Sequence, residues 1–224
     1  MKKSLSIALA ILLALILCGG ALAETVYVSI SCGDGSLPLP NAEIEVSDLD
    51  GDGALTINDA LIAAHNAAFE SGAAAGYATE MTDYGLSMIK LWGEENGGSY
   101  GYYVNDASAF SLSDPIADGD YIHAYAYQDL EGWTDTYCYF DYADISEESF
   151  QLTLTALVYD ENWAQVPTAV EGAIITINGE DSAFTTAADG TVELSLSEPG
   201  EYVLSARSDS MTLVPPVWVV TIAE

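Results

Sequence analysis

The twelve residues from Asp48 to Asp59 constrain the fold more than any other segment. They read Asp-Leu-Asp-Gly-Asp-Gly-Ala-Leu-Thr-Ile-Asn-Asp, with carboxylates at loop positions 1, 3 and 5 and a glycine at position 6, where the chain must turn sharply. A hard cation with about six to eight oxygen ligands needs this density of carboxylates on a flexible loop. We therefore predict a Ca²⁺ site with the ligands Asp48, Asp50, Asp52, the backbone carbonyl of Ala54, Thr56 and Asp59. The alternative is a solvated acidic turn.

A helix is expected directly after this loop. Apolar residues recur there at helical spacing until two glycines end the pattern: Ile57, Leu61, Ala64 and Ala68, then Gly72 and Gly76. The segment from Asp48 to Glu70 resembles one half of a bacterial dockerin, or a single EF-hand. Dockerins use two such loops, whereas this sequence has one, so docking to a cohesin is not expected. The resemblance implies a structural Ca²⁺ site that fixes the helix against a sheet.

The first 23 residues have the order of a secretory signal peptide. Lys2-Lys3 precedes an apolar run from Ile7 to Leu17, and Ala21-Leu22-Ala23 supplies a cleavage site. The mature protein is therefore predicted to be secreted by a bacterium and extracellular. No later stretch offers about 18 uninterrupted apolar residues, so no membrane span is expected after cleavage. An uncleaved anchor, or lipidation at Cys18, is the alternative, although the bulky Leu17 is a poor fit to a lipidation signal.

The charge of the chain excludes two classes of partner. It has 35 acidic residues against 4 Lys and Arg, a net charge of −31, so nucleic acid and anionic membranes are repelled. Half of its residues are hydrophobic and 14 are Tyr, which indicates a folded protein and not a disordered acidic tail.

The pattern changes along the chain and predicts two domains after the signal peptide (1–23). In residues 24–148, strands are expected before and after the helix, among them Thr25 to Cys32 and Tyr100 to Val104, which is an α+β order. In residues 149–224 the pattern is strand-like throughout. Turn pairs such as Asn178-Gly179 and Asp189-Gly190 recur about every 10 residues there, which favours a β-sandwich.

Both regions resemble known domain families. Gly101-Tyr-Tyr-Val-Asn-Asp106, followed by Asp118-Gly-Asp-Tyr-Ile122, resembles the β-grasp domain at the C-terminus of transcobalamin. This resemblance implies a β-grasp sheet crossed by one helix, into which the EF-hand-type loop would be built. Residues 151–224 resemble a bacterial immunoglobulin-like or carboxypeptidase-regulatory-like domain through Gly172-Ala-Ile-Ile-Thr-Ile-Asn-Gly179 and Glu198-Pro-Gly-Glu-Tyr-Val203. These motifs are turns and strands, so they indicate fold and not function.

Aromatic residues are concentrated on one expected strand. From Asp120 to Tyr127 the residues Tyr121, His123, Tyr125 and Tyr127 alternate with Ile122, Ala124 and Ala126, so one face of that strand is aromatic. Together with Tyr103, the tyrosines Tyr121, Tyr125 and Tyr127 are our candidate ligand-binding surface for a sugar or a protein. The simpler alternative is core and cross-strand packing.

Two cysteines remain after cleavage, Cys32 and Cys138. Each shares a strand face with apolar neighbours, so both sulfurs are expected to point toward a core. Export permits a disulfide between them, and two buried free thiols are the alternative. The β-grasp resemblance implies that the first and last strands lie side by side, which would suit the bridge.

No sequence motif supports catalysis. The two histidines, His65 and His123, lie outside any hydrolase or phosphate-binding pattern, and acidic pairs are too abundant to single one out. The sequence therefore predicts an exported, non-catalytic, calcium-binding protein of a surface-binding or adhesion type, with an unidentified protein or glycan partner at the cell surface. A corrinoid-like small-molecule carrier, implied by the transcobalamin resemblance, is the alternative.

Overall fold

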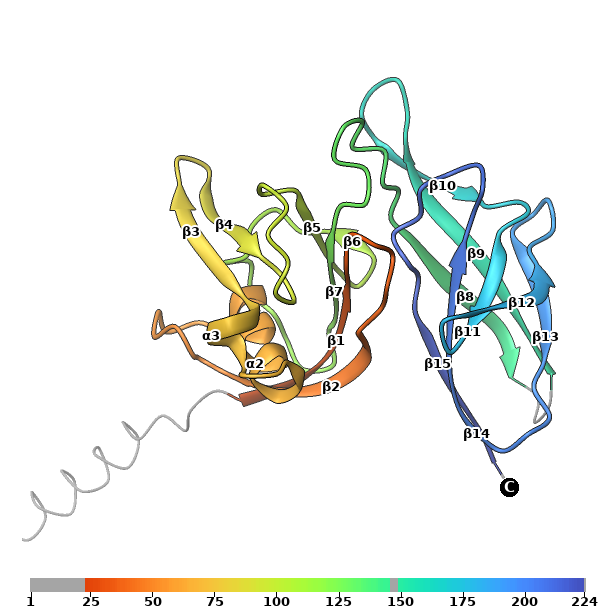
Figure 1. Ribbon diagram of the computed structural model, residues 1–224, viewed down its shortest axis with the longest axis horizontal. Helices are drawn as coiled ribbons and strands as arrows, with labels where there is room; N and C mark the ends of the chain where they lie inside the picture. Colours follow the sequence, from red (N-terminus) through yellow and green to blue (C-terminus); the bar gives the residue numbers. More distant parts are fainter. Residues whose placement is uncertain (1–22, 146–148, 224) are drawn as a thin grey trace, which may run out of the picture.

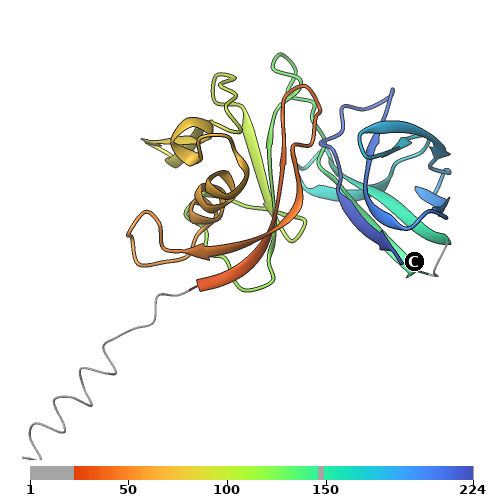
Figure 2. The ribbon, with the colours of Figure 1, turned by 60° about the horizontal axis from the view of Figure 1, so that its bottom comes forward.

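The computed structural model describes residues 23–145 and 149–223. Most of the predicted signal peptide lies outside the described residues. The strands gather into two units that lie next to each other, an N-terminal unit from β1 to β7 and a C-terminal unit from β8 to β15 (Figures 1 and 2). The predicted domain boundary at residue 149 falls between β8 and β9, which pair with each other, and it stays a prediction.

The N-terminal unit is built on a five-stranded sheet in the order β2-β1-β7-β5-β6. Strands β1 and β7 pair in parallel, and the other neighbours are antiparallel. Strands β3 and β4 form a separate hairpin. The elements are β1 (Ala23–Ser31), β2 (Leu39–Ser47), α2 (Ile57–Ala68), α3 (Ala73–Gly76), β3 (Ala78–Thr82), β4 (Gly85–Lys90), β5 (Tyr100–Val104), β6 (Ala107–Ser108) and β7 (Tyr121–Ala126).

One face of this sheet forms the core of the N-terminal unit. Because side chains alternate along a strand, Val26, Val28 and Ile30 of β1 point to the same side, where they are fully buried. Helix α2 covers that side and contributes Ile57 and Leu61, which belong to the same apolar cluster. The helix therefore forms where the sequence predicted it, with its apolar stripe against the sheet.

The opposite face of the sheet carries polar and aromatic residues. On β1 and β7 the facing pairs are Tyr27 with Tyr121, Ser29 with His123 and Ser31 with Tyr125.

The C-terminal unit covers much of this face, where Tyr103 and Tyr125 cluster with Tyr137, Leu157 and Val214. The rings of Tyr103 and Tyr137 are stacked, with centroids 3.6 Å apart and planes 4° apart. Stacking of this kind adds about 0.5–1.5 kcal/mol beyond the burial of area.

Hydrogen bonds join the two units at the same place. The Gln165 side chain donates to the Tyr103 hydroxyl over 2.6 Å, and the Tyr137 hydroxyl donates to an Asp106 carboxylate oxygen over 2.7 Å. Gly101 on β5 is required beneath Tyr125, because a Cβ there would lie 2.2 Å from Cζ of that ring. The face of the sheet that carries Tyr103 and Tyr125, which we call the tyrosine face, therefore makes a specific contact with the C-terminal unit.

The C-terminal unit is a β-sandwich. One sheet has the order β10-β9-β13 with β8 also paired to β9, and the other has the order β12-β11-β14-β15. Both sheets contribute to one buried cluster, which includes Leu152, Leu194, Ile175 and Leu204. The strands are β8 (Cys138–Ile145), β9 (Ser149–Tyr159), β10 (Gln165–Ala169), β11 (Ile174–Ile177), β12 (Glu180–Thr185), β13 (Thr191–Ser195), β14 (Gly200–Arg207) and β15 (Trp218–Ile222).

The predicted fold class, α+β with a β-grasp domain built around an EF-hand-type loop, is wrong. Strand residues far outnumber helical residues in the described part of the chain, whose two helices have only 12 and 4 residues. The expected strand around Cys138 leaves the first sheet: β8 pairs with β9, and Cys138 and Phe140 are buried in the sandwich core.

No helix in the described part of the chain has the length and apolar character needed to cross a membrane.

Candidate functional site

Three carboxylates converge on the loop between β2 and α2. One oxygen from each of Asp48, Asp50 and Asp52 lies within 4.8 Å of the others, and all three residues are exposed. Like charges at this separation repel one another, and a cation placed between them would remove that repulsion. Carboxylate oxygens are the ligands of hard divalent cations, so the donor set fits a metal ion of that kind.

Backbone amides hold the loop in shape around Asp48. Its two carboxylate oxygens accept from the N–H groups of Gly51, at 2.7 Å, and Gly53, at 3.0 Å. Both glycines have left-handed backbone angles, with φ of 80° and 90°, which residues with a Cβ seldom adopt. This explains why the chain carries glycine at these two positions.

The other side-chain ligands that we predicted, Thr56 and Asp59, lie behind the loop and cap the helix. Thr56 is the N-cap of α2, and its hydroxyl and the Asp59 carboxylate form a capping box. Asp59 is fully buried, and its oxygens also accept from the N–H groups of Leu49, at 2.7 Å, and Asp50, at 3.3 Å. The structure therefore brings three of the predicted ligands together and assigns the carboxylate of Asp59 to backbone amides.

Ala54 and Asn58 complete the loop. Ala54 is exposed, and its N–H donates to Asp52 over 2.8 Å. The Asn58 side chain, which the sequence analysis missed, donates to Asp50 over 2.9 Å and accepts from the Tyr77 hydroxyl over 3.0 Å. Asn58 thereby connects the acidic group to the buried side of α2. Its position in the loop pattern gives no signal of this role.

The four candidate ligand-binding tyrosines are not equally accessible. Tyr103 and Tyr125 are buried between the two units, and Tyr121 and Tyr127 are half-buried. Core packing therefore describes Tyr103 and Tyr125. Tyr159, the last residue of β9, is exposed and lies beside Tyr103, Tyr125 and Tyr127, and the exposed Trp163 follows it in the turn before β10.

Both cysteines are free thiols. Cys32 is half-buried, whereas Cys138 is buried and its thiol donates to the Val214 carbonyl over 3.1 Å. The two residues belong to different units, because Cys32 directly follows β1 and Cys138 begins β8. Of the two alternatives that the sequence left open, the structure has the free thiols. Burial raises the pKa of both, which disfavours the reactive thiolate.

The two histidines are buried and neutral. Nε2 of His65 on α2 accepts a hydrogen bond from the backbone N–H of Trp92. The ring proton therefore lies on Nδ1, which donates to the Leu61 carbonyl over 2.7 Å. His123 lies on the tyrosine face of the sheet, and burial lowers its pKa to about 3. Both rings are packed among aromatic side chains, an arrangement that stabilises the fold.

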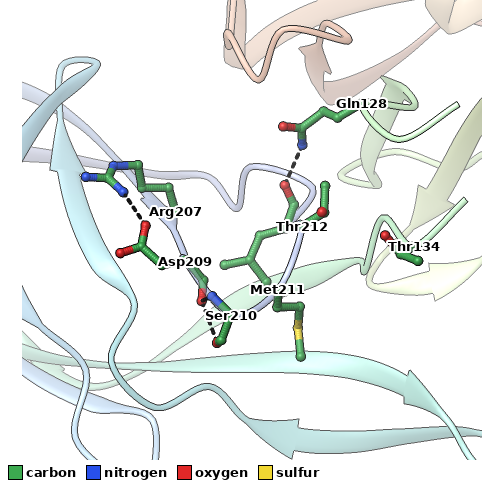
Figure 3. Close-up of a pocket in the computed structure, with 9 residues that line it drawn as sticks. Gln128, Thr134, Arg207, Asp209, Ser210, Met211 and Thr212 are labelled. Carbon is green, nitrogen blue, oxygen red and sulfur yellow. Dashed lines mark hydrogen bonds and ion pairs between the residues drawn. The ribbon is translucent and has the colours of Figure 1, made fainter. Parts of the chain in front are cut away.

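A cavity of about 560 Å³ lies where the segment after β7 meets the segment between β14 and β15 (Figure 3). The Gln128 side chain donates across it to the Leu213 carbonyl over 2.7 Å. Arg207 on its edge is already paired with Asp181, at 2.6 Å, and with Asp209, at 3.1 Å. The positive charge of Arg207 is therefore engaged within the protein, and it is a poor anchor for an anionic ligand.

These features define a mostly β protein of two units with one acidic loop able to hold a metal ion. No protein-family model matches the chain, and no curated protein matches it. Among solved structures, the chain is similar to the D0-D1 domain of intimin, at 10% identity and a TM-score of 0.33, over 91% of this chain and 100% of that one.

The buried Asp59 carboxylate is predicted to stabilise the loop without any metal. Asp59→Ala keeps the Thr56 N-cap but removes the carboxylate half of the capping box, and it leaves the N–H groups of Leu49 and Thr56 without their acceptor. We therefore expect a loss of about 2–4 kcal/mol in unfolding free energy. Urea unfolding in EGTA measures it. The matched control is Asp52→Ala, whose exposed carboxylate accepts from the nearby Ala54 N–H and whose loss is expected to cost less than about 1 kcal/mol. Equal losses in the two variants would contradict this role of Asp59.

Proposed function

We propose that this chain is an exported, non-catalytic, calcium-binding protein of a surface-binding or adhesion type, in which Ca²⁺ is a structural staple. The observation that carries the proposal is the convergence of Asp48, Asp50 and Asp52 on a loop that joins β2 to α2. Calcium accepts the exposed, all-oxygen ligand set that this loop offers, and extracellular sites bind it with dissociation constants on the order of 10⁻⁴–10⁻³ M.

The position of the loop explains how binding would act on the fold. One end of the loop follows β2, an edge strand of the five-stranded sheet, and the other end is the cap of α2. Asn58 links Asp50 to the Tyr77 hydroxyl, so an ion held by Asp50 would be connected to the buried side of the helix. A bound ion would thus hold the helix and the sheet edge together, and unfolding would release it.

A partner surface is offered by Tyr159 and Trp163. Trp163 is 83% exposed and Tyr159 is 55% exposed, and their ring centroids lie 6.3 Å apart. Exposed aromatic rings next to each other are typical of sites for sugars or protein partners. The half-buried Tyr127 lines a shallow cavity beside Tyr159, which extends this surface toward the N-terminal unit.

Calcium is expected to raise the thermal unfolding midpoint of residues 24–224. At about a hundredfold excess over its dissociation constant, Ca²⁺ stabilises the folded state by about 2.7 kcal/mol, which for a chain of this size is about 5–10 °C. The midpoint is measured in Ca²⁺ and in EGTA for the wild type, for the double variant Asp50→Ala, Asp52→Ala, and for Asp83→Ala, which removes an exposed acid between β3 and β4. Only the double variant should lose the shift. No shift in the wild type would show that the loop is a solvated turn.

Binding to the cell surface is expected to depend on Trp163. The wild type is applied to a glycan array and to insoluble bacterial cell-wall material, alongside Trp163→Ala and Phe110→Ala. Phe110 is the matched control, because it is an aromatic residue that is 93% exposed on the N-terminal unit. We expect Trp163→Ala alone to reduce binding by at least about tenfold, as is typical for a stacked aromatic anchor. If both variants bound the glycans and the cell-wall material as well as the wild type does, Trp163 would not be part of the binding surface.

A further inference from the structure

A further cavity lies at the seam between the two units, beside Tyr121 and Tyr137. It measures about 340 Å³, which is within the range of small-molecule sites. β1, β7, β8 and β15 all contribute to its lining, together with the turn between β5 and β6. Its side chains include Tyr27, Asn41, Asp106, Tyr121, Tyr139 and Trp218. The wall is thus mainly aromatic, with one carboxylate and one amide.

The carboxylate in this wall is held in an unusual way. Asn105 and Asp106 both have left-handed backbone angles, with φ of 50° and 61°, at the tight turn between β5 and β6. Glycine is favoured at the second position of such a turn, and aspartate is among the few other residues that tolerate it. One oxygen of Asp106 accepts the Tyr137 hydroxyl, and no hydrogen bond from the described residues reaches the other.

No basic side chain of the described residues forms an ion pair with the Asp106 carboxylate. Lys90 and Arg207 are the basic side chains of the described part of the chain, and both are paired elsewhere, with Glu95 and with Asp181 and Asp209. Desolvation raises the pKa of Asp106, the hydrogen bond from Tyr137 partly offsets this effect, and the nearby charge of Asp141 adds to it. His123, on the same face of the sheet, is neutral. A cation that entered the cavity would therefore meet no competing positive group among the described residues.

We propose that this cavity binds a small organic cation with N–H donors, namely a primary ammonium group on a short aliphatic arm. The Asp106 carboxylate and the Asn41 side-chain amide accept from the ammonium, and the tyrosine rings and Trp218 surround its charge and its methylene groups. A free amine and the side chain of a lysine present the same chemistry. This site is separate from the acidic loop and goes beyond the proposed role of calcium.

The test uses n-butylammonium as the probe, titrated into residues 24–224 and followed by tyrosine ring signals in NMR spectra. Uncharged n-butanol has the same aliphatic arm and is the control ligand. We expect butylammonium to shift the signals of Tyr121 and Tyr139, and butanol to bind at least tenfold more weakly. N-acetyl-lysine methylamide, tested in parallel, distinguishes the two sources, because binding of butylammonium alone favours a free amine and tight binding of the lysine derivative favours a peptide side chain.

Two variants locate the site. Asp106→Asn keeps an acceptor for the Tyr137 hydroxyl and a residue that tolerates the left-handed turn, so it is expected to fold and to weaken butylammonium binding at least tenfold. Glu193→Gln removes one exposed acid from β13 and should leave binding unchanged. If Asp106→Asn does not fold, Tyr27→Leu, at a partly exposed ring of the wall, should weaken binding instead. No binding to the wild type, equal binding of butanol, or equal binding to Asp106→Asn would overturn the proposal.

Discussion

The structure depends on one sheet that is covered on both faces. The side of the sheet that carries Val26, Val28 and Ile122 packs on helix α2, and the side that carries Tyr103 of β5 and Tyr125 of β7 packs on the C-terminal unit. A strand buried on both sides must satisfy its polar groups internally. The hydroxyl of Tyr103 does so by accepting from Gln165, and the hydroxyl of Tyr137, which packs on this face from just before β8, donates to Asp106. The contact between the units is therefore part of the fold and decides which aromatic residues remain for a partner.

The surplus of acidic residues acts at two scales. Across the molecule it gives the chain a net charge of −31. Locally, Asp48, Asp50 and Asp52 are held close together by the turn of the loop, and Asp106 is held at the seam without a basic partner. In the loop, the three carboxylates repel one another, and at the seam the carboxylate of Asp106 is partly removed from water. A cation would offset both unfavourable effects.

Several features could be predicted from the sequence because they depend on local pattern. The glycines of the acidic loop and the spacing of its aspartates predicted the group of three carboxylates, and helical spacing predicted the helix from Ile57. The strand Tyr100–Val104 was also predicted at its observed bounds. The sequence pattern could not predict what packs against each strand face. Alternation showed that Cys138 and Phe140 share a buried face, but it could not show that this face belongs to the second core.

The candidate site was predictable only in part for a similar reason. An aspartate at loop position 12 fits both a metal ligand and the third residue of a capping box, and the sequence cannot separate the two roles at Asp59. The alternating tyrosines of β7 predicted an aromatic face, but what covers that face depends on residues far along the chain, such as Gln165 and Val214. Long-range contacts of this kind leave no periodic signal.

The most direct test of this account is scanning calorimetry of residues 24–224, because it reports whether the two units unfold together. If the tyrosine face joins them, the wild type unfolds in one cooperative transition, and Tyr137→Ala, which removes the ring stacked on Tyr103, separates it into two. Two independent transitions in the wild type, unchanged by Tyr137→Ala, would contradict the account.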